Sequence, residues 1–191
     1  MYINLTSDYS ISFSAYQNNE IDWTETFTPA EVDMISADEE LNAQYHPGYG
    51  DFRTYYLGYN TYAAPFNDIK VRQAFAKVID RDSIIANVVG RQGMAAYSFL
   101  MPGFPAADAD TYKAMDVNKL DVAAAKQLLT DAGFPDGKGF PKLTLALRNE
   151  GDLNVAVANA VAAMITENLG IEVEVANQDR KVFMDALNAH T

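Results

Sequence analysis

The 191-residue sequence contains no cysteine and only two histidines. The lack of cysteine excludes disulfide bonds, zinc–thiolate sites and thiol nucleophiles. It is also compatible with an oxidising compartment. His46 stands before a proline with no partner at metal-ligand spacing, and neither His46 nor His190 lies in the context of a catalytic triad. The residue types therefore predict no cofactor and no metal site.

Basic residues are also scarce, with 14 Lys and Arg against 26 Asp and Glu and a formal charge of −12. Nucleic acid and anionic membrane surfaces are therefore disfavoured as partners. No apolar run reaches the roughly 18 residues that a membrane-spanning helix needs, and the N-terminus lacks the pattern of a signal peptide. The length and the overall composition, with 49% hydrophobic and 21% charged residues, are ordinary for a globular domain or one large lobe.

Carboxylates are plentiful, but no pair stands out as a catalytic pair. Glu172 and Glu174 share one face of an expected strand, and a solvent-facing surface accounts for them as well as a carboxylate hydrolase does. Asp108 and Asp110 lack the glycine and the distal glutamate of an EF-hand loop, so we expect solvated turn residues there. We therefore predict that the protein is not an enzyme.

The stretch 54–85 is the one around which the chain is organised. Thr54–Asn60 alternates in a run rich in aromatic residues, which predicts a strand, and Pro65 argues against a continued central strand. Asn67 or Asp68 can cap a following helix, and Asp80 can cap a second one. The residues expected on the buried side of the first helix are Ile69, Val71, Ala74, Phe75 and Val78.

In the N-terminal third, Thr28-Pro29-Ala30-Glu31 has the pattern of a capping box at the start of a helix. Ser7 or Asp8 can cap an earlier helix that ends at Asn18-Asn19. Trp23 is interpreted as a core anchor, with ligand stacking as the alternative.

The C-terminal third has the pattern of a strand, a helix and a strand. Leucines alternate over 143–147, a helix is expected from Asp152 to Leu169, and apolar residues alternate again over 171–175. Two such strands joined by a helix are expected to pair in parallel. A last helix, from Asp179 to about Ala189, should bury Val182, Phe183, Ala186 and Leu187. The fold class predicted is α/β, a mixed sheet flanked by helices.

Four phrases also carry a family resemblance. YYLGYNTYAAPFNDIKVRQAFAKVIDRDSII (55–85) resembles the signature segment of the extracytoplasmic solute-binding proteins, family 5, of ABC importers for oligopeptides, dipeptides or nickel. Three further matches follow the family's order: AYQNNEIDW (15–23), AKQLLTDAGFPDGKGFPKLTL (125–145) and NLGIEVEVANQD (168–179). Together the matches cover nearly the whole chain.

The resemblance implies a periplasmic-binding-protein-like fold of type II, cluster C, with two lobes that close around a ligand. It implies an extracytoplasmic location, in the periplasm or as a cell-surface lipoprotein, and delivery of the ligand to an ABC permease. Residues 1–191 are then expected to be most of one lobe, with the partner lobe and the C-terminal end of this lobe absent. The resemblance leaves the identity of the ligand open: it can be a peptide, a nickel chelate or another small solute. The competing interpretation is a stand-alone interaction or scaffold domain.

Three ligand-binding candidates follow from the resemblance. Asn154 occupies a position, after the LTLAL strand, where the family often places a polar residue at the cleft; a solvated helix residue is the alternative. Arg180 stands where peptide binders commonly have a tryptophan, and it could pair with a ligand carboxylate or face water. Tyr2 lies in a first strand that borders the cleft. The acidic residue that grips the ligand's amino terminus should follow the last helix, so we expect residues 1–191 alone to bind peptide weakly or not at all.

Overall fold

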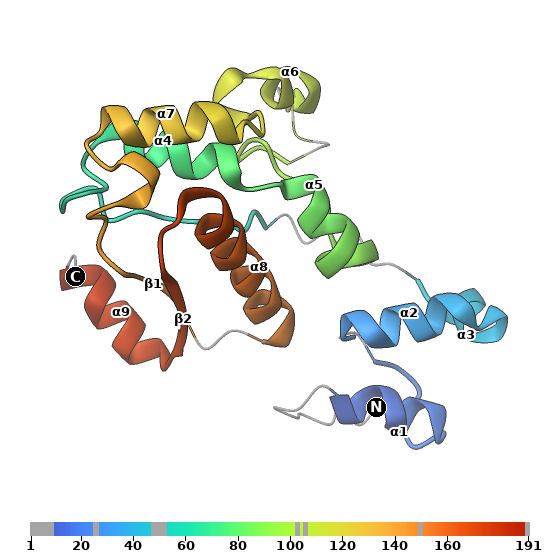
Figure 1. Cartoon of the computed structure of the whole chain (residues 1–191). Coiled ribbons are helices and arrows are strands. Elements are labelled where there is room, and N and C mark those ends of the chain that lie inside the picture. Colours follow the sequence, from blue (N-terminus) through green and yellow to red (C-terminus); the bar gives the residue numbers. More distant parts are fainter. Residues whose placement is uncertain are drawn as a thin grey trace.

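The computed structural model describes residues 10–24, 27–46, 53–101, 104, 107–148 and 151–189 (Figure 1). The expected strand at Tyr2–Leu5 and the expected caps Ser7 and Asp8 lie outside these residues. In chain order the elements are α1 (Ser10–Gln17), α2 (Pro29–Ala37), α3 (Glu39–Gln44), α4 (Ile69–Val78), α5 (Arg81–Ile84), the π-helical η1 (Ile85–Val89), the 3₁₀ turn η2 (Gly90–Gln92), α6 (Ala109–Ala114), η3 (Asp116–Asn118), α7 (Val122–Asp131), η4 (Pro135–Gly137), β1 (Leu143–Arg148), α8 (Asp152–Leu169), β2 (Val173–Gln178) and α9 (Arg180–Ala189).

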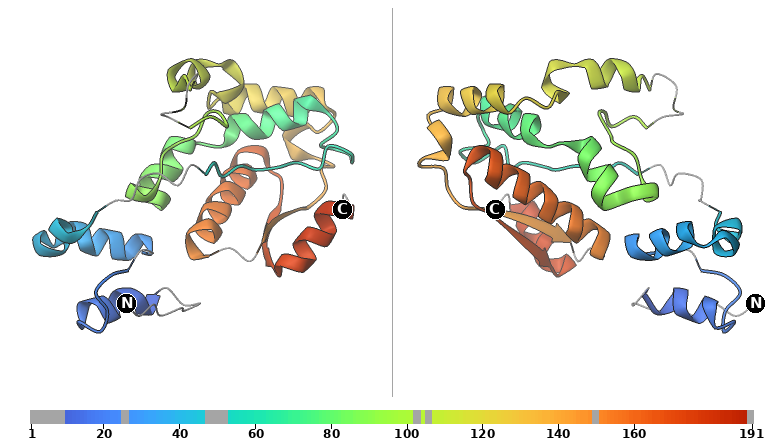
Figure 2. Two further views of the ribbon diagram at one scale, coloured as in Figure 1. Left: turned by 180° about the vertical axis from the view of Figure 1, so that it is seen from behind. Right: turned by 45° about the vertical axis from the view of Figure 1, so that its right-hand side comes forward.

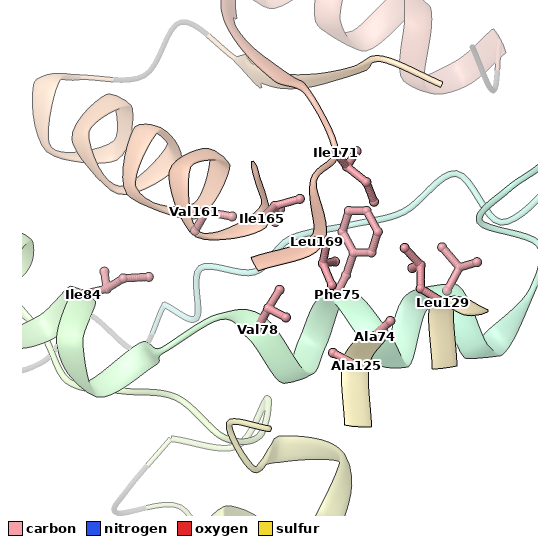
Figure 3. Packing of buried hydrophobic residues seen from close by; sticks show 11 residues of the cluster. Ala74, Phe75, Val78, Ile84, Ala125, Leu129, Val161, Ile165, Leu169 and Ile171 are labelled. Atoms are coloured by element: carbon pink, nitrogen blue, oxygen red, sulfur yellow. The ribbon is translucent and has the colours of Figure 1, made fainter. Parts of the chain in front are cut away.

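Helix α4 lies at the centre of the main hydrophobic core. Asp68 is its N-cap, as predicted, and its Oδ1 accepts a hydrogen bond from the Lys70 N–H at 2.8 Å. Ile69, however, is 57% exposed, contrary to expectation. It precedes Val71 by two residues, which places it about 200° around the helix from the buried stripe. The buried cluster consists of Val71, Ala74, Phe75, Val78, Ile84, Ala125, Leu129, Val161, Ile165, Leu169 and Ile171 (Figure 3).

Strands β1 and β2 pair in parallel, with Leu143 opposite Val173 and Arg148 opposite Gln178, and α8 makes the crossover between them. The predicted βαβ unit and the α/β class are confirmed. Both described strands run parallel, so the antiparallel partner of a mixed sheet is not among the described residues. Strand β1 differs from the interior strand expected, because Thr144 and Ala146 on one face are exposed.

Aromatic rings extend the core from α4 to the turns on either side of it. The Tyr59 ring stacks on Phe66 at 4.9 Å, and Phe66 meets Phe75 edge to face at 5.2 Å. Phe140 lies 5.7 Å from Phe75 and 4.8 Å from Phe134, between centroids. Burial in this cluster raises the pKa of Tyr59 to about 12. These contacts fix the segment before α4 and the turn after α7 on one scaffold.

The predicted strand Thr54–Asn60 is not part of a sheet in the described structure. Leu57 and Tyr59 lie half-buried against the core, whereas Tyr55 and Tyr56 are exposed. The alternation in the sequence therefore predicts which side chains pack on the core, although the segment pairs with no strand of the described structure.

Helices α1, α2 and α3 form a smaller cluster of their own, which lies to one side of the other elements (Figures 1 and 2). The predicted capping box is confirmed, with Thr28 N–H donating to Glu31 Oε2 at 2.6 Å and Glu31 N–H to Thr28 Oγ1 at 3.3 Å. Trp23 is 69% exposed, so its interpretation as a core anchor is wrong in this structure. The buried side chains here are Phe13, Val32 and Ile35.

Replacing Phe75 by Ala should destabilise the chain by about 3–5 kcal/mol, because a fully buried ring is lost and the aromatic neighbours cannot collapse into its space. The matched control is Ile69→Ala on the exposed side of the same helix, which should change the free energy of unfolding by no more than about 0.5 kcal/mol. Urea-induced unfolding measures both. Equal losses for the two variants would contradict the central position of α4.

Gly137→Ala should be far more destabilising than Gly139→Ala. Both glycines have positive φ, at 73° and 78°. A Cβ on Gly137 would lie 2.5 Å from the Leu169 carbonyl oxygen, whereas a Cβ on Gly139 meets nothing within 4 Å. Gly139→Ala should therefore cost only the backbone penalty of about 1–2 kcal/mol, and Gly137→Ala roughly 1–3 kcal/mol more. Chemical denaturation of the pair would reveal equal costs if this close approach were unimportant.

Candidate functional site

The carboxyl ends of β1 and β2 meet at one edge of the sheet, and two of the predicted ligand-binding residues follow them there. The last pair in register is Arg148 with Gln178. Helix α8 begins just beyond β1 at Asp152, and α9 begins just beyond β2 at Arg180. Figure 1 shows both helices starting at this same edge. In open α/β sheets, ligands commonly bind outside the carboxyl ends of the strands.

Asn154 lies in the first turn of α8, where it is half-buried. It precedes Ala158 and Val161 by four and seven residues, so it lies at the amino end of the stripe of α8 that faces the core. The backbone here can also bind a polar ligand group, because the N–H groups in the first turn of a helix have no intrahelical partners. Asn154 thus lies in the helix turn that follows the carboxyl end of β1, and its contact with a ligand stays a prediction.

Arg180 is the first residue of α9, and its side chain is exposed. The carboxylate of the preceding residue, Asp179, already has a partner in this helix, because its Oδ1 accepts a hydrogen bond from the Lys181 N–H at 2.8 Å. Lys181 in turn pairs with Asp185 at 2.5 Å along the same helix. Among the described residues, no hydrogen bond or ion pair is seen for the Arg180 guanidinium. An exposed guanidinium held at a sheet edge is suited to a carboxylate.

Sequence reasoning missed Arg148, the last residue of β1, which lies at the same edge as Arg180. The signal was available: once 143–148 and 173–178 are paired in parallel, the final residue of each strand must lie at the carboxyl edge. The third candidate, Tyr2, lies outside the described residues.

The opposite end of the sheet has a different electrostatic arrangement. Lys142 Nζ bridges Glu172 at 2.9 Å and Glu174 at 3.1 Å, and all three side chains are exposed. The hydrogen bonds that Lys142 donates to Glu172 and, less strongly, to Glu174 raise the pKa of Lys142. The two glutamates are thus partners of a lysine on an open surface, and they do not converge in a pocket as a carboxylate hydrolase would need.

Two hollows lie on other parts of the described surface. One of about 340 Å³ is bounded by the segment 97–100, Tyr112, Met115 and Asn118. The other, of about 560 Å³, lies between α4, η3 and α7. Neither is lined by Asn154 or Arg180. In the described part of the chain, no group of three or more His, Asp or Glu side chains could hold a metal ion, and no helix is long and apolar enough to cross a membrane.

The second hollow contains a buried lysine with a structural role. Lys77 Nζ donates to the Asp116 carbonyl oxygen at 2.7 Å and to Asp116 Oδ2 at 3.0 Å. The Asp121 N–H donates to the Lys77 carbonyl oxygen at 2.9 Å, so the end of α4 is tied to the start of α7. The hydrogen bond and charge of Lys77, with a smaller effect of the Lys119 charge, lower the pKa of Asp116. The ammonium is thus already satisfied by this chain.

Comparison with known proteins decides the family. Residues 3–191 match the family described as "Bacterial extracellular solute-binding proteins, family 5 Middle". The chain belongs to this family. The resemblance seen in the four sequence phrases is therefore confirmed.

Three relatives of family 5 illustrate how far the likeness extends. The periplasmic oligopeptide-binding protein OppA of Salmonella typhimurium is 32% identical over 100% of this chain and 34% of its own length. The structure of the Escherichia coli murein tripeptide binding protein MppA matches 95% of this chain and 35% of its own, with a TM-score of 0.73 and 30% identity. Haemophilus influenzae OppA, in a complex with RPPGFSPFR, matches 69% of this chain and 26% of its own, with a TM-score of 0.54 and 26% identity. The chain thus spans about a third of the length of the curated relatives it matches.

The Lys77–Asp116 pair of this family 5 chain should make its stability depend on pH. Because the pKa of Asp116 is lower in the folded state than its ordinary value of 3.8, the pair's contribution is fully present above pH 3.8 and is lost as the pH falls through the folded pKa. The difference in unfolding free energy between the wild type and Asp116→Asn should be constant from about pH 5 to 7 and shrink below about pH 4.

The control for this pH dependence is the same comparison in a Lys77→Met background, which keeps an apolar stem in the buried position. There Asp116→Asn should have an effect that no longer varies with pH, and urea unfolding across the range measures it. An unchanged pH dependence without Lys77 would show that another group is responsible.

Proposed function

We propose that this chain is the part of an extracytoplasmic solute-binding protein that helps to capture a peptide or similar small solute, which an ABC importer then takes up. The observation that carries the proposal is the match to family 5 over residues 3–191, together with the structural likeness to a murein tripeptide binding protein over 95% of the chain. Family membership gives no support to an enzyme or a stand-alone scaffold, and we propose that the protein is neither.

The proposed ligand class is a peptide. Relatives are named oligopeptide-binding, dipeptide-binding and murein peptide-binding proteins, and one solved relative holds RPPGFSPFR. A peptide offers a terminal carboxylate and a row of backbone amide groups. Arg180 suits the first, and the amide of Asn154, which both donates and accepts hydrogen bonds, suits the second. The named relatives support this class over a nickel chelate.

We propose that the ligand surface is completed by a partner lobe of the same protein. At the carboxyl edge of β1 and β2, Arg148 and Arg180 are exposed and Asn154 is half-buried among the described residues, so a second wall would be needed to exclude water from a bound peptide. Closure of two lobes around the ligand would supply that wall, and an ABC permease would receive the closed form. Tyr2 stays a candidate for the same cleft.

The remaining parts of this proposal are location and domain organisation. Family 5 proteins are described as extracellular, which supports a place in the periplasm or on the cell surface as a lipoprotein. That residues 1–191 form a single lobe stays a prediction. The residues of the main core come from the part of the sequence between Val71 and Ile171. Phe13, Val32 and Ile35, on α1 and α2, are buried outside this core.

In the full-length protein, Arg180→Ala should weaken binding of peptides with a free carboxyl terminus by about 10–100-fold, the cost of losing one charge-assisted hydrogen bond. The same peptides with an amidated carboxyl terminus should show little difference between wild type and variant. Lys181→Ala is the matched control, because that neighbouring lysine pairs with Asp185 on α9. Titration calorimetry with a pool of di- to pentapeptides provides the measurement.

Two outcomes of this titration count against different statements. Unchanged affinity in Arg180→Ala would remove Arg180 from the site while leaving the function in place. A folded full-length protein that binds none of the peptides would contradict the proposed function. The chain 1–191 alone should bind far more weakly than the full-length protein, since it carries only one side of the proposed cleft.

A further inference from the structure

A second arginine, Arg148, lies with Arg180 at the carboxyl edge of the sheet. Arg148 ends β1 opposite Gln178, the last residue of β2, and Arg180 follows Gln178 by two residues as the first residue of α9. Neighbouring strands are about 4.8 Å apart, and two residues of chain span at most about 7 Å. The Cα atoms of the two arginines are therefore within about 12 Å of each other.

The two arginines also lie on the same side of the strands. Leu143 and Leu145 of β1 pack on the main core. Arg148 belongs to the alternate set, with Thr144 and Ala146, which is exposed on the opposite face. Helix α9 packs against β1 on the side of the strands away from α8 (Figures 1 and 2). One small ligand at this edge can therefore reach both guanidinium groups.

Two described acidic residues close to these arginines in the sequence have local roles in their own helices. Asp179 Oδ1 accepts a hydrogen bond from the Lys181 N–H at 2.8 Å. Asp152 lies in the first turn of α8, where the helix dipole favours a negative charge. The edge thus carries two guanidinium groups on a chain whose formal charge is −12.

We infer that Arg148 makes the protein prefer peptides that carry an acidic side chain in one of their last two residues. The inference rests on the proposed function, in which Arg180 binds the free carboxyl terminus of the peptide. Adjacent residues of a peptide have Cα atoms about 3.8 Å apart, so such a side chain holds its carboxylate close to the terminal one. Two neighbouring arginines match two neighbouring carboxylates, because each guanidinium can bind one of them with two parallel hydrogen bonds.

Discrimination comes as much from rejecting other peptides as from attracting acidic ones. When the partner lobe covers the ligand, a neutral side chain beside Arg148 leaves a desolvated guanidinium without a charged partner, which costs free energy. A lysine side chain at the same place adds repulsion between like charges. The preference for an acidic over a neutral side chain should be about 10-fold, as expected for one hydrogen bond between charged groups.

Titration calorimetry of the full-length protein with matched tetrapeptides tests the inference. Ala-Ala-Glu-Ala with Ala-Ala-Gln-Ala is one pair, and Ala-Ala-Ala-Glu with Ala-Ala-Ala-Gln is the other. The members of a pair differ only by a carboxylate and an amide of the same shape. In the wild type, the acidic member of at least one pair should bind about 10-fold more tightly than its neutral counterpart. In Arg148→Gln the ratio of the two affinities should fall close to one.

Two further variants separate a direct contact from other effects of charge. Arg180→Gln should weaken both members of a pair by a similar factor, because both have a free carboxyl terminus, and the ratio should remain. Lys142→Gln changes the net charge as much as Arg148→Gln does, but at the opposite end of the sheet, where the lysine pairs with Glu172 and Glu174. It should also leave the ratio as it is in the wild type.

Charge reversal gives a readout that a loss of folding cannot imitate. In Arg148→Glu, the preferred peptide should change from the acidic one to its lysine counterpart, Ala-Ala-Lys-Ala or Ala-Ala-Ala-Lys. The new carboxylate attracts the ammonium group of the lysine and repels the carboxylate of the glutamate. The same titration measures this reversal.

The results that would overturn the inference differ from those that would overturn the function. Ratios near one for both pairs in the wild type would remove the acidic preference while the protein still binds peptides. A preference that Arg148→Gln leaves unchanged, or that Lys142→Gln removes equally, would show that Arg148 is not its source. A folded full-length protein that binds none of the peptides would contradict the proposed function, and the inference with it.

Discussion

The packing of Phe75 against its neighbours is the interaction on which the rest of the structure depends. Its ring is fully buried on α4 and contacts Phe66 before that helix and Phe140 after α7. The same cluster includes Leu169 and Ile171, which join α8 to β2 (Figure 3). One aromatic side chain thus connects three segments that are far apart in the sequence. Dispersion and burial around Phe75 hold the end of α8 in place. Since α8 connects β1 to β2, it in turn positions the carboxyl edge of these strands, where the candidate site lies.

A close backbone approach completes that positioning. Gly137 and Gly170 face each other across the turn after α7 and the end of α8, where each would bring a Cβ within about 3 Å of a carbonyl oxygen. Side chains would force the two turns apart at this contact. Since β2 begins three residues after Gly170, the contact also fixes where the second strand starts. The site residues at the far end of β1 and β2 therefore depend on contacts made at the near end.

Features decided by neighbouring residues in the sequence were predictable, and features decided by distant packing were not. Thr28, Asp68 and Asp80 cap helices as predicted, because each side chain accepts a hydrogen bond from an N–H within three residues of it. The parallel pairing of β1 and β2 also followed from local pattern and crossover length. Trp23 and the segment 54–60 were misjudged because their sequence patterns are equally consistent with burial here or against another element. Asn154 and Arg180 were candidates from the family resemblance, whereas Arg148 could be placed at the same edge only from the strand register.

The two ends of the sheet differ in a way that bears on function. At the amino end, Lys142 is held between Glu172 and Glu174, so its charge is balanced within the chain. At the carboxyl end, Arg180 is exposed at a helix start, on a chain whose formal charge is −12. A stability role would favour pairing this arginine with one of the many carboxylates available. Its exposure at the edge where α/β sheets commonly bind ligands is the reason why we propose Arg180, and not Lys142, as a contact for a peptide carboxylate.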